Sequence, residues 1–153
     1  MIASSNARAT RGFLWAGADS ETMSEQRRAN YALIDCREHL GEDASALDVP
    51  WADFVGSSTS EETFTVPTDD VVDPYVELQA YDVGAYGHEI VVNGESLSGF
   101  DIPPAEGWQF WMDELTGADL HAGENTIAIE RDTDVHDEFV VGTVVVNWRE
   151  PVE

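Results

Sequence analysis

Residues 75–83 read YVELQAYDV, and this stretch alternates apolar positions with polar or aromatic ones. Successive side chains of a β-strand point to opposite faces, so the stretch predicts a strand with one buried face and one solvated face. The buried face consists of Val76, Leu78 and Ala80. The solvated face consists of Tyr75, Glu77, Gln79 and Tyr81. Such a strand is typical of an antiparallel sheet that packs one side on a core.

The segments on both sides of this strand carry similar signals. Short strands are expected at 62–66 and at 88–92 because apolar and β-branched residues alternate there between turn residues. Asn93-Gly94 follows the second of these and is the strongest short-range signal for a hairpin, which would place Leu97 on the returning strand.

Two further strands are expected toward the end of the chain. Gly123 and Asn125 supply turn chemistry before TIAIERD (126–132), in which the apolar residues alternate. The segment EFVVGTVVVNWRE (138–150) is rich in β-branched residues. It predicts a strand that is either buried on most of both faces or kinked at Gly142.

Three stretches are less regular. Residues 30–40 fit a strand or a short helix, and we favour the strand. Residues 41–60 contain glycine, proline and serine runs and predict an irregular connection, anchored locally by Trp51 and Phe54. Residues 108–115, WQFWMDEL, fit a helical turn or a bulged strand.

Strands at this density, without amphipathic helices between them, imply an all-β fold, an antiparallel β-sandwich. A chain of 153 residues that is 42% hydrophobic suits one globular domain. We expect an N-terminal arm at 1–28, which docks through the short aromatic stretch Phe13–Trp15, followed by the sandwich at 29–153.

Acidic residues dominate the composition. The chain has 31 Asp and Glu against 7 basic residues, all of them Arg, which gives a net charge of -24. At 1 M salt the electrostatic screening length falls to about 3 Å, so closely spaced carboxylates become tolerable. The composition therefore predicts a protein adapted to high salt, as in haloarchaea. It also excludes nucleic acid as a partner, because phosphate contacts need clustered Lys and Arg.

Cysteine and hydropathy patterns indicate a soluble protein. Cys36 has no second cysteine to pair with in the chain, and we interpret it as a buried structural thiol. No stretch approaches the roughly 18–20 consecutive apolar residues of a membrane span, and the N-terminus lacks the apolar core of an export signal. We expect no membrane insertion, and a location in the cytoplasm or within a virus particle.

Three segments resemble galactose-binding-like jelly rolls, such as the sugar-binding domains of family 2 glycoside hydrolases and many carbohydrate-binding modules. They are HEIVVNGESL (88–97), DELTGADLHAGENTIAIER (113–131) and GTVVVNW (142–148). The resemblance covers roughly residues 62–149. It implies a jelly-roll sandwich, sugar binding and a structural calcium, whereas the catalytic carboxylates of such hydrolases lie in a separate barrel. The chain also resembles haloarchaeal families without an assigned function.

Flat aromatic rings on a solvated strand face are where sugars stack, with nearby polar groups to bind hydroxyls. The candidate ligand-binding residues are therefore Tyr75, Glu77, Gln79, Tyr81, Tyr86 and Trp108. For the tryptophans an alternative stays open, in which Trp108, Trp111 and Trp148 close the ends of the sandwich as core residues.

Hard cations prefer clustered oxygen ligands, and one acidic loop offers them. The candidate calcium ligands are Asp132, Asp134, Asp137 and Glu138, although the loop lacks the spacing of an EF-hand and an acidic protein produces acidic loops in any case. No other cofactor is expected.

No catalytic residues can be nominated. With so many carboxylates, pairs at any spacing occur by chance. The four histidines share no metal-binding spacing and are interpreted as surface residues: His39, His88, His121 and His136.

Two functions remain. The first is a non-catalytic binding module for a carbohydrate or a glycosylated surface at high salt. The alternative is a structural protein, either an oligomer subunit or a component of a haloarchaeal virus particle, that docks on protein partners through its sheet face and N-terminal arm.

Overall fold

The structure is a computed structural model that describes residues 2–4, 7–8, 26–97, 102–116 and 119–152. The chain divides into two compact units, Met1–Ala29 with Arg149–Glu153, and Asn30–Trp148. In the first unit β1 (Ile2–Ser4) pairs in parallel with β2 (Ala7–Arg8). Within that unit the Arg28 guanidinium lies 2.9 Å from the buried carboxylate of Glu150. The aromatic stretch 13–15 lies outside the described residues.

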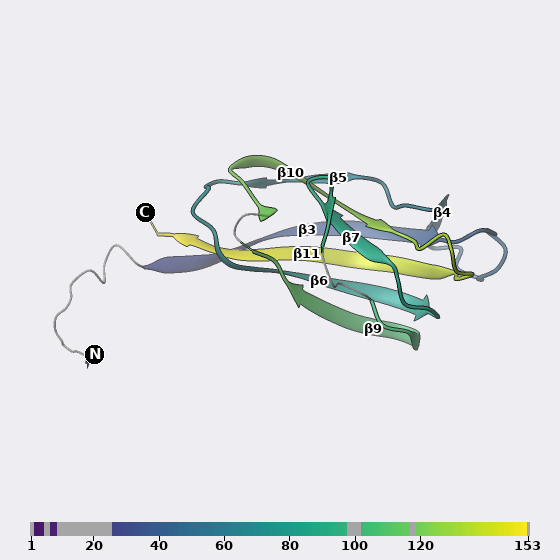
Figure 1. Cartoon of the computed structure of the whole chain (residues 1–153), viewed down its shortest axis with the longest axis horizontal. Helices are drawn as coiled ribbons and strands as arrows, with labels where there is room; N and C mark the ends of the chain where they lie inside the picture. The colour runs from purple at the N-terminus through teal and green to yellow at the C-terminus, as the bar shows by residue number, and fades with distance from the viewer. Residues whose placement is uncertain (1, 5–6, 9–25, 98–101, 117–118, 153) are drawn as a thin grey trace. The chain divides into compact units, whose positions relative to one another are not determined.

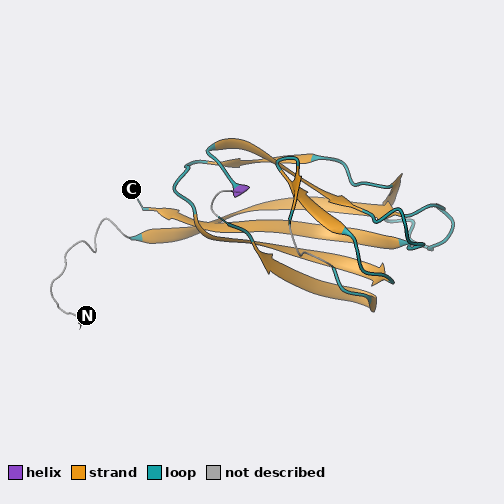
Figure 2. Cartoon of the chain, in the orientation of Figure 1, coloured by secondary structure: helices purple, strands orange, loops and turns teal. Residues whose placement is uncertain are grey.

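The second unit is a sandwich of two sheets (Figures 1 and 2). The larger sheet has five strands in the order β4 (Asp53–Gly56), β3 (Arg27–Leu40), β11 (Phe139–Pro151), β6 (Val72–Val83) and β9 (Ala105–Glu114). The smaller sheet has four strands in the order β5 (Glu62–Val66), β10 (Gly123–Glu130), β7 (Glu89–Val92) and β8 (Glu95–Ser96). The predicted all-β sandwich is confirmed.

The core lies between the two sheets and is built from alternate residues of the strands. The side chains that the YVELQAYDV pattern assigns to the buried face are all at most 1% exposed. They pack in one hydrophobic cluster with Ile90 of β7, Ile129 of β10 and Trp148 of β11. Strand β11 is buried at each of its first four positions, as the β-branched run predicts. Alternation in the sequence therefore placed the core correctly.

The hairpin prediction at Asn93-Gly94 is also confirmed. Both residues have positive φ, 51° and 85°, and the turn joins β7 to β8. Gly123 has φ 96°, which a glycine tolerates before β10. Asn125 was expected to favour a turn conformation, but its role is to accept hydrogen bonds. Its fully buried Oδ1 accepts from the His121 amide at 3.0 Å and from the Asn93 side chain at 2.9 Å. It links two turns rather than adopting a turn conformation.

The less regular stretches resolve as follows. Residues 30–40 form part of β3, as favoured, whereas the irregular connection at 41–60 contains the short strand β4, which was not expected. The segment WQFWMDEL is mostly strand, because β9 extends to Glu114 and pairs antiparallel with β6 over its length. A helical turn would have left the ladder groups of β6 without these partners.

No helix in the described part of the chain has the length and apolar character needed to cross a membrane.

Candidate functional site

Three aromatic rings from two strands and a loop meet on the outer face of the larger sheet. Tyr81 of β6 and Trp108 of β9 are directly paired across the strands, and their ring centroids lie 5.2 Å apart. Trp51, from the segment before β4, lies 5.6 Å from Trp108 and 6.0 Å from Tyr81. We call these three residues the aromatic platform.

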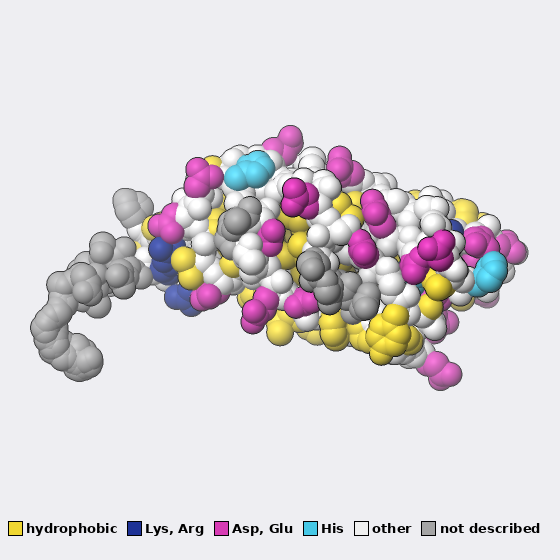
Figure 3. Space-filling view, viewed as in Figure 1, with side chains coloured by type: hydrophobic (Ala, Val, Ile, Leu, Met, Phe, Trp, Pro, Cys, Tyr) yellow, Lys and Arg dark blue, Asp and Glu magenta, His cyan; other side chains and the backbone are white. Residues whose placement is uncertain are grey.

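Further exposed apolar side chains extend from the platform along β9. Alternate residues of this strand face outward, and Trp108, Phe110 and Met112 are 51%, 64% and 54% exposed. Figure 3 shows hydrophobic side chains gathered along the lower edge of this view, over β9. Exposed apolar side chains that adjoin one another, rather than being scattered singly, make this face a candidate binding surface.

Polar groups flank the rings on β6. Gln79 is exposed and pairs across the strands with Phe110, and Glu77 pairs with Met112. The Asn147 side chain on β11 donates to Glu77 Oε1 at 3.1 Å, so the carboxylate is held in place. Amide and carboxylate groups beside exposed rings can bind hydroxyl groups of a ligand that stacks on the rings.

Gly142 of β11 explains how Trp108 can lie over the neighbouring strands. A Cβ at this position would lie 3.0 Å from the Trp108 ring and 3.3 Å from Gln79 Oε1. A glycine inside a strand often marks a place where another group approaches closely. The missing side chain thus makes room for the ring.

Gly142→Ala is expected to displace the Trp108 ring. Alanine fits an ordinary strand conformation and would by itself add about 0.5–1 kcal/mol of stability over glycine. The new methyl group must push the indole outward, so near-UV circular dichroism of the platform should weaken while the far-UV spectrum stays unchanged. An unaltered near-UV spectrum would show that the ring does not depend on Gly142.

A depression of about 530 Å³ adjoins the platform at Tyr81. It is lined by Leu47, by the end of β6 and by the start of β9, and three carboxylates contribute to the lining: Asp82, Glu106 and Glu138. Asp82 has φ 60° at an irregularity in the β6–β9 ladder, and its carboxylate accepts a bond of 2.7 Å from the Gly107 amide. The irregularity shapes this end of the sheet next to the rings.

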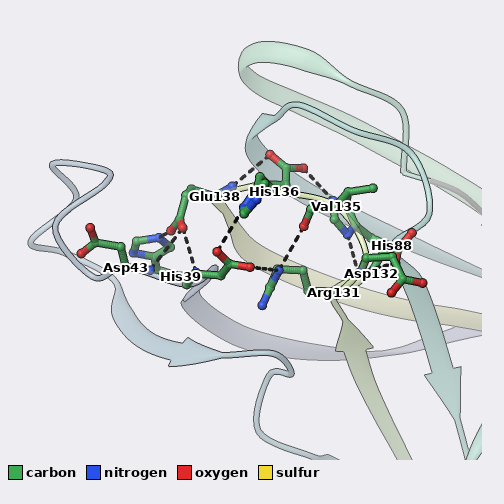
Figure 4. A network of polar contacts seen from close by, with 11 residues as sticks. His39, Asp43, His88, Arg131, Asp132, Val135, His136 and Glu138 are labelled. Atoms are coloured by element: carbon green, nitrogen blue, oxygen red, sulfur yellow. Dashed lines mark hydrogen bonds and ion pairs between the residues drawn. The ribbon is translucent and has the colours of Figure 1, made fainter.

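Glu138, which also lines the depression, is hydrogen-bonded to the end of β3 and to the loop that follows it. Its carboxylate bonds His39 Nε2 at 2.7 Å and accepts from the backbone amides of Glu42 at 2.7 Å and Asp43 at 3.2 Å (Figure 4). A Cβ at Gly41 would collide with this carboxylate. Since His39 is only 2% exposed, the pair is shielded from solvent on the histidine side.

Asp137 plays the same part for the loop after β6. It bonds His88 Nε2 at 2.7 Å and accepts from the backbone amides of Gly84 at 3.0 Å and Ala85 at 3.1 Å. The Asp132 amide donates to His88 Nδ1 at 3.0 Å, so the ring hydrogen lies on Nε2 and points to Asp137. Burial raises the pKa of Asp137, but the bonds from His88, Gly84 and Ala85 outweigh it and hold the pKa below its ordinary value.

These pairs correct the interpretation of two histidines. His39 and His88 are buried and bonded to carboxylates rather than lying on the surface. His121 and His136 are exposed, as expected, and His136 is near Glu42 at 3.1 Å. Because both partners of each buried pair are far apart in the sequence, no local spacing could indicate them.

The four candidate calcium ligands are arranged differently from a metal cage. Asp137 and Glu138 are bonded to protein donors, Asp132 accepts from the Asp134 amide at 2.9 Å, and Asp134 is exposed. Over the residues that the structure describes, no three His, Cys, Asp or Glu side chains are grouped so that they could hold a metal ion. Calcium binding stays a prediction, and protein donors alone account for this network.

Cys36 is partly buried, and its thiol lies 3.5 Å from Glu38 Oε1. Burial and the neighbouring Glu38 carboxylate raise the pKa of the thiol to about 12. Because the thiolate is the reactive form, this cysteine is structural rather than nucleophilic.

The predicted ligand-binding residues divide into two groups. Tyr81 and Trp108 meet in the platform, and Gln79, Glu77 and Tyr75 follow on the same face of β6. Tyr86 lies apart in the loop after β6 and is 62% exposed. Trp111 and Trp148 face the core, as the alternative held, but Trp108 does not.

Solved structures with a similar fold were found. The CBM36-1 domain of a multidomain xylanase from the hindgut metagenome of Trinervitermes trinervoides has a TM-score of 0.52 at 11% identity, covering 76% of this chain and 96% of that chain. A family 35 carbohydrate-binding module from an environmental isolate has a TM-score of 0.50 at 14% identity, covering 79% and 97%. Dimeric latent PorU from Porphyromonas gingivalis scores 0.53 at 10% identity, covering 88% of this chain but 14% of that chain.

These likenesses define the class: the protein is a jelly-roll β-sandwich of the kind found in carbohydrate-binding modules, as the sequence resemblance predicted. No curated protein matches the sequence. The chain belongs to a family of unknown function (DUF7383), whose profile matches residues 28–150.

Proposed function

We propose that the protein is a non-catalytic carbohydrate-binding module that works in concentrated salt and holds its ligand on the aromatic platform. The observation that carries this proposal is the cluster of Trp51, Tyr81 and Trp108 on an exposed sheet face. Pyranose rings present C–H groups that pack on aromatic faces, and indole and phenol rings offer large contact areas at a small cost in side-chain entropy.

The surroundings of the platform support this proposal. Gln79 and the Glu77–Asn147 pair offer both donors and acceptors at the edge of the rings. The platform and the adjoining depression together form an open surface rather than an enclosed pocket, which suits a polymer. The similarity in fold to solved carbohydrate-binding modules supports the same proposal.

Replacing the central ring tests the proposal. Trp108→Ala should weaken glycan binding by roughly thirtyfold, because buried aromatic anchors contribute about 2 kcal/mol or more at such interfaces. Retention on insoluble β-1,4-glucan, xylan and mannan in 1 M KCl, followed by titration of tryptophan fluorescence with the matching oligosaccharides, measures the loss.

Tyr31→Ala is the matched control, because Tyr31 is 63% exposed on β3 of the same sheet but lies outside the platform. Equal losses in both variants, or full binding by Trp108→Ala, would contradict the assignment.

A second function, assembly into an oligomer or a larger particle, is favoured by one observation. Leu33 and Met112 are 59% and 54% exposed on strands of the larger sheet, and aliphatic side chains suit a protein partner better than a sugar. Light scattering in molar KCl separates the two functions. Assembly predicts a defined oligomer that Met112→Ser dissociates, whereas a binding module predicts that Met112→Ser leaves the measured mass unchanged.

A further inference from the structure

We propose that the platform selects uncharged glycans and rejects glycans that carry carboxylate or sulfate groups; this inference rests on the proposed function and adds the ligand class to it. Three segments carry the rings and the outward side chains beside them: β6, β9 and residues 44–56. None of them contains Lys, Arg or His. An anionic sugar stacked on the rings would therefore find no cation supplied by these segments.

Within Asn30–Trp148 the two arginines, Arg37 and Arg131, lie outside these segments. Arg37 lies on β3, separated from β6 by β11, and its guanidinium is 3.1 Å from Asp35. Arg131 donates to the Val135 carbonyl at 3.3 Å and lies 3.7 Å from Glu42. The buried histidines are bonded to the carboxylates of Asp137 and Glu138, as described above.

Carboxylates, by contrast, lie on the same two strands as Tyr81 and Trp108. Glu77 faces outward on β6, Glu106 and Glu114 stand at the two ends of the outward row of β9, and Asp82 lines the depression beside Tyr81. A sugar carboxylate placed among them would lose water on the ring face without gaining a cationic partner from these segments, and it would meet like charges. Repulsion of the wrong ligand is an effective source of specificity.

The same groups suit hydroxyls. A hydroxyl can donate to the Glu77 carboxylate and accept from the side-chain amide of Gln79, whereas a carboxylate can only accept. Asn147 keeps Glu77 oriented through the 3.1 Å bond, so the acceptor is in place before the ligand arrives. Polar recognition and charge repulsion thus favour the same ligand class.

The test compares glycans that differ only in charge. The neutral probes are a soluble β-1,4-glucan, xylan and mannan. Each is paired with a counterpart that bears carboxylates: C6-oxidised glucan, glucuronate-substituted xylan and polymannuronate, respectively. Binding is measured in 1 M KCl, where long-range repulsion is screened and the remaining preference reports contacts at the platform. We expect the neutral member of the bound pair to bind about tenfold more tightly.

Two variants place a cation at different sites with the same change in charge. Gln79→Lys adds one at the platform and should strengthen binding of the carboxylate-bearing polymer about tenfold, whereas Thr65→Lys on β5 of the other sheet should not. Equal or tighter binding of the anionic polymer by the wild-type chain would overturn the ligand class and leave the proposed function standing. Retention of no polymer of either kind would overturn both.

Discussion

Asp137→Asn should lower the free energy of unfolding by roughly 3 kcal/mol, because one substitution disturbs four hydrogen bonds at a buried carboxylate. The donors are His88 Nε2 and the amides of Gly84, Ala85 and Glu138. Asparagine keeps the size of the side chain but turns an NH₂ group toward donors that need an acceptor. Chemical denaturation at neutral pH in a fixed concentration of salt measures the loss.

The pH dependence of this difference is the diagnostic part of the experiment. The pKa of Asp137 is lower in the folded protein than its ordinary value near 3.9, so its ionised form stabilises the fold above about pH 4. That contribution disappears as the pH falls through the lowered folded pKa. The gap in stability between wild type and Asp137→Asn should therefore be full at pH 7 and shrink in strong acid.

Asp134→Asn is the control, because Asp134 is an exposed carboxylate in the same loop. Its effect should stay within about 0.5 kcal/mol, as for most surface substitutions. A gap for Asp137→Asn that stayed constant down to pH 2 would show that packing, rather than the ionised carboxylate, stabilises this loop.

Salt should change the stability of the whole protein more than any single substitution in its surface. With a net charge of -24, self-repulsion acts over about 30 Å at 0.01 M salt but over about 3 Å at 1 M. We expect the thermal midpoint to rise on the order of 10 °C between these conditions, which corresponds to a gain of several kcal/mol for a domain of this size. Differential scanning calorimetry in a KCl series measures the rise.

Neutralising exposed acids tests whether charge is the cause. A variant with Gln at Glu61, Glu95 and Glu124, three exposed glutamates, should reach the same midpoint at a lower KCl concentration. Sucrose, which strengthens burial without screening charge, should not reproduce the difference between the two proteins. A midpoint that is independent of KCl would refute adaptation to high salt.

Local pattern predicted the sandwich well. The alternation in YVELQAYDV separated the core side chains of β6 from the outward ones, and Asn93-Gly94 located a hairpin with both residues at positive φ. Both signals depend on neighbours within a few positions, and a sequence records those directly. The outward placement of Tyr81 followed from the same alternation.

The rest of the site depends on contacts that the pattern does not record. Trp51 of the platform lies in a connection whose sequence predicts no regular structure. The exposure of Phe110 and Met112 could not be predicted, because WQFWMDEL fits both a helical and a strand period. His39 and Glu138 are 99 positions apart, and His88 and Asp137 are 49 apart. Gly142 offered a signal, since a lone glycine in a β-branched strand indicates a close approach, but its partner Trp108 could not be named from the sequence.

The adjacent pair Asp137 and Glu138 has a consequence for the fidelity of folding. The two residues directly precede β11. Asp137 is hydrogen-bonded to His88 and to backbone amides of the loop after β6, and Glu138 is hydrogen-bonded to His39 and to backbone amides of the loop after β3. A shift of β11 by one position would turn its core side chains outward and would also offer each buried histidine the wrong acid or none. A chain with β11 out of register would thus be destabilised by packing and by electrostatics together. The Asp137-Glu138 dipeptide therefore helps to specify the register of the central strand.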